Sequence, residues 1–207
     1  MTLTFTRPAL ALALALTLAA CGGKATFPVA GTIEGLKYDG LVLSTNGMTL
    51  PVAANATSFR FPDPLSYGEV YNVIAQAQPA HQTCSVASFQ GRTGVLYNGP
   101  TDTAGRFGAI NIGVLCTTNL IALKGTIKGL PPATSLQLIN GSDGGTVTVL
   151  GTGADLIFTL PSVAYGKTYG ITVLAAPADQ VCSVSNGTGE MTDAAPVNIE
   201  VSCVKKT

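Results

Sequence analysis

The chain has 207 residues, of which 46% are apolar, 11% are charged and 6% are aromatic. Eleven Lys and Arg residues balance eleven Asp and Glu residues, so the formal net charge is zero. A near-neutral chain lacks the clustered basic face that nucleic-acid binding requires, so we expect no nucleic-acid partner. The apolar content is too high for a disordered chain, and the abundance of Gly, Thr, Ser, Ala and Asn suits an extracytoplasmic β protein.

Residues 1–20 have the features of a secretory signal. Arg7 and Pro8 precede an apolar run of Ala, Leu and Thr that ends at Ala20, which is within the signal range and too short to span a bilayer. The run ends in Leu18-Ala19-Ala20-Cys21, which resembles the lipobox of bacterial lipoproteins. This resemblance implies cleavage before Cys21 and lipidation of Cys21. An ordinary cleaved signal beside a chance cysteine is the alternative.

Cleavage before Cys21 would leave a lipidated tether at 21–26 ahead of the folded part of the chain. Each buried lipid CH₂ contributes about 0.8 kcal/mol, so acyl chains hold a protein on a membrane without a transmembrane span. The membrane is therefore an expected partner. Gly22 at the next position resembles outer-membrane sorting in proteobacteria, which places the protein in the cell envelope, on either the periplasmic or the surface face.

The other four cysteines are expected to form disulfides. Cys84, Cys116, Cys182 and Cys203 are an even number in an exported chain, which is typical of disulfides. A zinc site is the alternative, but zinc ligands usually come in closely spaced pairs. The spacings here are 32, 66 and 21, and the single histidine, His81, has no obvious partner. We therefore expect no metal and no cofactor.

The chain contains an internal repeat of about 90 residues. The sequence Gly-Thr-Ile-x-Gly-Leu at 31–36 recurs at 125–130, and Gln-x-Cys-Ser-Val at 82–86 recurs at 180–184. Asn46-Gly47 is matched with Asn140-Gly141, and each copy ends on an alternating strand that reaches a cysteine. The predicted domains are 27–117 and 118–207. Pairing within copies, Cys84 with Cys116 and Cys182 with Cys203, gives both copies the same closure and is favoured.

Each copy is predicted to be an all-β domain. The second contains seven short segments of alternating or β-branched residues, separated by Gly, Pro, Asn and Asp. These segments lie near 120–128, 135–139, 146–150, 156–160, 168–175, 181–185 and 196–203. No stretch after the signal keeps a helical apolar period. The chain is therefore predicted to hold two tandem seven-stranded antiparallel β-sandwich domains, each with one disulfide.

One stretch resembles the collagen-adhesin B-type (Cna-B) and carboxypeptidase-regulatory modules of the prealbumin-like sandwich. It comprises Phe59-Arg60-Phe61-Pro62, Gly68, Tyr71 and Pro79 and recurs in the second copy. Many Cna-B modules carry a Glu that promotes an isopeptide cross-link. The matching positions here are Ala75 and Val173, which cannot transfer a proton, so we expect no such cross-link. The paired signatures also resemble repeats of proteobacterial lipoproteins and surface proteins.

No constellation in the sequence specifies a reaction, and no catalytic residue is assigned. His81 is matched with Asp179 of the second copy and is interpreted as an exposed polar turn residue. The first copy has 11 extra residues between its cysteines, which are placed in or near 91–107. A remote alternative is a hydrolase whose site is built from Arg92, Asp102 and Arg106 in this insertion.

The leading functional hypothesis is a non-enzymatic envelope protein with a structural, adhesive or binding role, whose loops contact a protein or a glycan. The alternative is an accessory subunit that recruits a partner complex in the periplasm. Both hypotheses rest on lipid display and on small duplicated sandwiches, because surface loops are where such domains acquire individual binding functions.

Overall fold

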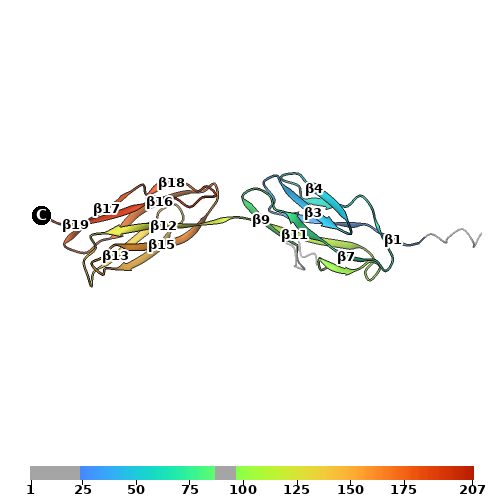
Figure 1. Cartoon of the computed structure of the whole chain (residues 1–207), viewed down its shortest axis with the longest axis horizontal. Coiled ribbons are helices and arrows are strands. Elements are labelled where there is room, and N and C mark those ends of the chain that lie inside the picture. Colours follow the sequence, from blue (N-terminus) through green and yellow to red (C-terminus); the bar gives the residue numbers. More distant parts are fainter. Residues whose placement is uncertain (1–23, 87–96) are drawn as a thin grey trace, which may run out of the picture. The chain divides into compact units, whose positions relative to one another are not determined.

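The described part of the chain consists of strands, turns and irregular segments. The computed structural model describes residues 24–86 and 97–207, and these residues contain no helix long and apolar enough to cross a membrane. They divide into two compact units, both drawn in Figure 1. Unit 1 runs to Gln78 and includes Cys84–Leu115, and unit 2 comprises Pro79–Thr83 and Cys116–Thr207. The predicted all-β class is confirmed.

Unit 2 contains two four-stranded sheets, with the orders β15-β12-β19-β17 and β14-β13-β16-β18. Seven of these strands correspond to the segments predicted for this copy, and the structure adds the three-residue strand β18. Their bounds are β12 (Leu120–Lys128), β13 (Ser135–Asn140), β14 (Gly145–Leu150), β15 (Leu156–Ala164), β16 (Thr168–Ala175), β17 (Gln180–Ser185), β18 (Thr188–Glu190) and β19 (Glu200–Lys205).

The core of unit 2 is made by both of its sheets. Alternate side chains of a strand point to opposite faces, so each sheet can bury one face. Leu123 and Ile127 of β12 are fully buried in a cluster with Leu136 and Leu138 of β13, which belongs to the other sheet. Burying one such side chain contributes about 1.5–3 kcal/mol. The two sheets of unit 2 therefore form a sandwich.

Unit 1 follows the same plan with shorter strands. Its larger sheets have the orders β5-β2-β11-β9 and β4-β3-β8, and two-stranded pairs join β1 to β6 and β10 to β7. The bounds are β1 (Thr26–Phe27), β2 (Val29–Glu34), β3 (Leu41–Thr45), β4 (Met48–Val52), β5 (Ser58–Arg60), β6 (Leu65–Ser66), β7 (Val70–Asn72), β8 (Ile74–Ala77), β9 (Gln82–Val86), β10 (Thr101–Thr103) and β11 (Ile110–Thr118).

In each copy an early strand pairs with the closing strand, and this pair is parallel. β2 runs parallel to β11, and β12 runs parallel to β19. The other strand ladders of the described residues are antiparallel, as predicted. A parallel pair needs a long crossover connection, and the rest of each copy supplies it. The sequence could not reveal these parallel pairs, because the direction of pairing leaves no mark on the alternation of side chains.

The first glycine of the Gly-Thr-Ile signature allows this parallel pair to form. A Cβ on Gly31 would overlap the carbonyl oxygen of Ile112 and lie 2.7 Å from Phe59 Cε1. A Cβ on Gly125 would lie 2.5 Å from Phe158 Cε1 and would also meet the backbone of the closing strand. Both copies thus need glycine at this position of the early strand, because an aromatic ring and the backbone next to it in the sheet leave no room for a side chain.

The predicted disulfides are present. Cys182 and Cys203 lie directly opposite each other in the β17–β19 ladder, with their Cα atoms 4.0 Å apart, and are joined by a disulfide. Cys84 on β9 and Cys116 on β11 are also disulfide-bonded, and these two strands are neighbours in one sheet. Closing a loop of 21 residues stabilises a domain by about 3 kcal/mol on the chain-entropy model.

Strand β10 of the first copy is the counterpart of β18 in the second. β10 pairs with β7 so that Asp102 lies opposite Tyr71, and β18 pairs with β16 so that Gly189 lies opposite Tyr169. Both pairings are antiparallel and involve three residues of each strand. Strand β10 therefore belongs to the repeated framework.

This equivalence corrects the position of the insertion in the first copy. Ala104 and Met191 each accept a 2.9 Å hydrogen bond from the glycine of the shared Gly-x-x-Tyr motif. Ala104 lies 12 residues before Cys116, as Met191 does before Cys203, so the 11 extra residues lie before Ala104. The interval 91–107 was therefore placed too late, because its last part is repeated framework. Residues 87–96 lie outside the described residues.

The match between the two Asn-Gly turns also shifts by one residue. Asn46 and Gly47 have φ angles of 48° and 74° and form the two-residue turn between β3 and β4, as Asn-Gly favours. Asn140 is instead the buried last residue of β13, and its side-chain oxygen accepts a 2.8 Å hydrogen bond from Gly170 N. In the first copy, the corresponding hydrogen bond runs from Asn72 N to the side-chain oxygen of Thr45, so Thr45 is the counterpart of Asn140.

We expect Gly125→Ala to destabilise unit 2 by about 1–3 kcal/mol, because the added methyl group must displace a packed ring and a strand backbone. Urea unfolding followed by circular dichroism measures this change. The control is Gly141→Ala, where a Cβ would meet only one atom, at an ordinary 3.6 Å. Equal unfolding midpoints for Gly125→Ala and the wild type would show that no close approach exists there.

Candidate functional site

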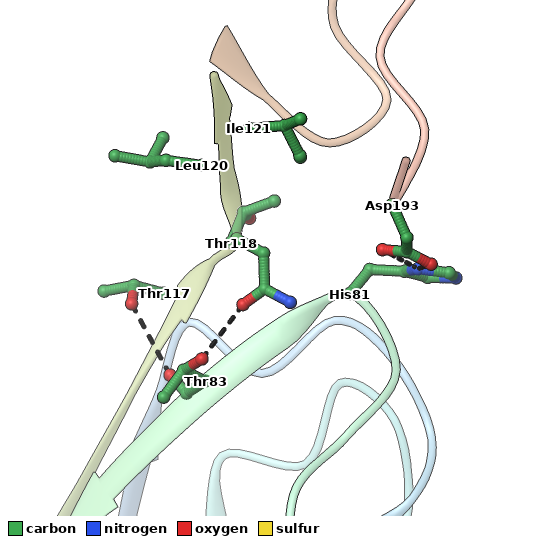
Figure 2. A pocket seen from close by; sticks show the side chains of 8 residues that line it. His81, Thr83, Thr117, Thr118, Leu120, Ile121 and Asp193 are labelled. Carbon is green, nitrogen blue, oxygen red and sulfur yellow. Dashed lines mark hydrogen bonds and ion pairs between the residues drawn. The ribbon is translucent and has the colours of Figure 1, made fainter. Parts of the chain in front are cut away.

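Unit 2 has a shallow hollow at one end, and we take it as the candidate site because it brings together the single histidine and a carboxylate. Its volume is about 1020 Å³. Figure 2 shows the side chains around it. They are His81, Thr83, Thr117, Thr118, Asn119, Leu120, Ile121 and Asp193.

His81 is held in an unusual backbone conformation. Its φ angle is 58°, in the left-handed region that costs a non-glycine residue about 1–2 kcal/mol. The carbonyl oxygen of His81 accepts a 2.9 Å hydrogen bond from Asn119 N, which helps to fix the turn. The same bond recurs in the second copy, where Lys206 N donates to Asp179 O at 2.8 Å. The match of His81 with Asp179 thus identifies one repeated turn.

The His81 ring makes two specific contacts within unit 2. It stacks on the ring of Tyr165, with the centroids 3.7 Å apart and the planes 5° from parallel. Its Nδ1 lies 2.7 Å and 2.9 Å from the two carboxylate oxygens of Asp193, as the dashed lines in Figure 2 mark. Such a bond is charge-assisted when the imidazole is protonated. Solvent screens it, since the Asp193 side chain is 59% exposed.

These contacts correct the interpretation of His81 as an exposed polar residue. The side chain is only 26% exposed. Sequence reasoning missed Tyr165 and Asp193 as its partners because Asp193 lies 112 residues away along the chain. Neither partner carries a signal in its own sequence context, since a tyrosine before a glycine and an aspartate in a loop are ordinary. The repeat alignment identified the turn but not what it contacts.

Two of the threonine hydroxyl groups that line the hollow donate to partners other than His81. Thr83 Oγ1 donates to Asn119 Oδ1 at 2.9 Å, and Thr117 Oγ1 donates to the carbonyl oxygen of Thr83 at 3.5 Å. A histidine that activates a nucleophile must accept the proton of that hydroxyl. These two threonine protons point to amide oxygens instead. These two hydroxyl groups therefore hold the turn in place.

No other predicted site residue that the structure describes is among those that line this hollow. Cys21 and Arg92 are outside the described residues. Asp102 and Arg106 do come together, with Nη1 of the guanidinium 3.4 Å from Asp102 Oδ1, at positions four residues apart. In the described ranges, no group of three or more His, Cys, Asp or Glu side chains could hold a metal ion.

Tyr71, the tyrosine of the stretch that resembles Cna-B modules, lies opposite Asp102. It is 1% exposed, and its hydroxyl has no hydrogen-bond partner. Burial raises the pKa of this phenol, the charge of Asp102 raises the pKa further, and Arg106 lowers it. The raised pKa keeps the phenol protonated at neutral pH, and the side chain packs in the core of unit 1.

Comparisons with known proteins give no family for this chain. No protein-family model matches it, and no curated protein matches it. Among solved structures, it is similar to the major pilin protein T3.2 of Streptococcus pyogenes serotype GAS13637, with 12% identity over 88% of this chain and 97% of that chain and a TM-score of 0.26. The major pilin protein T-13 of Streptococcus pyogenes serotype GAS131465 gives 12% identity over 87% and 95%, with a TM-score of 0.23.

We expect Tyr165→Leu to move the ring-proton resonances of His81 downfield, because a stacked aromatic ring shields the protons above it. The chain has one histidine, so proton NMR at fixed pH reports on this residue alone. The control is Tyr67→Leu, which removes an exposed tyrosine of unit 1. If Tyr165→Leu leaves the histidine resonances in place, the stacking does not exist in solution.

Proposed function

We propose that this chain is a lipid-anchored cell-envelope protein with a non-enzymatic structural, adhesive or binding role. The observation that carries the proposal is a lipobox-like sequence followed directly by disulfide-closed β-sandwich units. Disulfides such as Cys182–Cys203 form and persist outside the reducing cytoplasm. An exported chain with Cys21 at its mature N-terminus would be acylated and retained on a membrane.

The position of the first strand supports display close to a membrane. Strand β1 begins at Thr26, only five residues after Cys21. Five extended residues span at most about 18 Å, so unit 1 would stay near the bilayer surface. Gly22 after the lipobox favours the outer membrane, and the composition of the exposed positions suits an envelope protein.

The contacts of the polar side chains favour a binding role over catalysis. The imidazole of His81 is engaged by Tyr165 and Asp193, and Asp102 is paired with Arg106. The remote hydrolase hypothesis needs Asp102 and Arg106 to act together with Arg92. Asp102 lies in framework strand β10, whose backbone pairs with β7. We therefore favour loops that contact a protein or a glycan.

An adhesive role requires exposure on the cell surface, so protease added to intact cells should then digest both units. The Cys21→Ala variant should leave the membrane fraction, because it lacks the acylation site. Immunoblots of cell fractions before and after digestion measure both effects. A Cys84→Ala/Cys116→Ala double variant is the control, since it loses a disulfide but keeps the anchor. Protection of the wild type until the outer membrane is opened would contradict surface display and favour the periplasmic accessory role.

A further inference from the structure

The two units have the same construction at the end where their chain enters. Tyr165 N donates a 3.0 Å hydrogen bond to Asn119 O in unit 2, and Tyr67 N donates a 3.1 Å hydrogen bond to Ala25 O in unit 1. The strand pairs that follow also agree, since β1 pairs with β6 as the start of β12 pairs with the end of β15. Tyr67 is therefore the counterpart of Tyr165.

The two tyrosines differ in what covers them. Tyr165 lies under the His81 ring, whereas Tyr67 is 72% exposed. One side of the Tyr67 ring is supported, because Phe27 packs against it at 6.4 Å and a Cβ on Gly105 would clash with it. Phe27 and the backbone at Gly105 thus hold the Tyr67 ring in place from one side. Among the described residues of unit 1, no ring stacks on Tyr67 as His81 stacks on Tyr165.

More apolar and basic groups lie on the loop that supports Tyr67. Phe107 is 49% exposed, and the Arg106 guanidinium lies 5.8 Å from the centroid of its ring. Arg106 occupies the position that Asp193 has in unit 2, counted from the equivalent Ala104 and Met191. We call Phe27, Tyr67, Arg106 and Phe107 the tether-side surface. Asp102 offsets part of its positive charge, so the aromatic rings are its main feature.

We propose that the tether-side surface docks on the headgroup layer of the membrane in which Cys21 is anchored. This inference rests on the proposed lipid anchor. Three residues lie between Cys21 and Ala25, and the carbonyl oxygen of Ala25 accepts a hydrogen bond from Tyr67 N. The acylated cysteine therefore stays within about 14 Å of Ala25. Exposed Lys24 lies in the same tether and adds a second cation.

The chemistry of the surface matches a bilayer interface. Tyrosine is enriched there, because its ring is apolar and its hydroxyl remains hydrated. An arginine beside an exposed Phe can place its aliphatic stem among lipid chains and its guanidinium among phosphates. A second copy of this chain is the other conceivable occupant, since its Asp179 turn matches the His81 turn and has the opposite charge to Arg106.

The test uses Tyr67→Trp, since the wild-type chain has no tryptophan and the variant has a single reporter. The acylated protein is purified in detergent and reconstituted into vesicles of phosphatidylethanolamine and phosphatidylglycerol. We expect blue-shifted emission and loss of most of the fluorescence when the lipids carry brominated chains. Phe107→Trp should behave in the same way. Ile157→Trp in unit 2, where the wild-type side chain is 74% exposed, should remain water-like and unquenched.

Flotation separates the two ways in which the inference can fail. Protein that does not float with the vesicles overturns the anchor and the docking together. A Tyr67→Trp variant that floats while its emission stays water-like and unquenched overturns the docking alone. The docking on lipid is also overturned if the emission shifts to the blue, brominated lipids do not quench it, and Asp179→Ala reverses the shift. That result would show that a second copy of the chain covers the surface.

Discussion

The close approach of three chain segments at one glycine constrains each repeat. At Gly125 the first strand, the closing strand and the ring of Phe158 meet with no room for a side chain, and Gly31 repeats this with Phe59. This close approach lets the closing strand lie directly beside β2 in unit 1 and beside β12 in unit 2, and it runs parallel to both. The closing strand also carries the second cysteine of each copy, and the neighbouring strand on its other side carries the first. The glycine and the disulfide therefore both hold the closing strand.

The two copies of one framework differ in what covers the tyrosine at one end of each unit. In unit 2 the end is occupied by the His81 turn, which stacks on Tyr165 and contacts Asp193. In unit 1 the equivalent end presents Tyr67 to solvent, with Arg106 at the position of the aspartate. Small domains often gain new contacts in this way, because loop residues can change while the strands that carry them keep their packing.

Much of the fold could be predicted from the sequence, because local patterns indicate it. Alternating apolar and polar residues indicate strands, Asn-Gly indicates a hairpin, and cysteines at matching positions indicate disulfides. The errors arose where three-dimensional pairing decides the outcome. The 11 extra residues were placed too late because only strand register shows that Asp102 and Gly189 are equivalent. The partners of His81 were missed because stacking across a long stretch of chain leaves no periodic signal.

The account depends on an exported chain that carries lipid on Cys21 and is closed by two disulfides, and one mass measurement tests all of this together. The protein is extracted from membranes without reductant and its intact mass is determined. The account predicts that the first residue is Cys21 with a diacylglyceryl group, and that reduction adds two hydrogens to the mass for each disulfide. An unacylated mass, a different first residue or no change on reduction would contradict it.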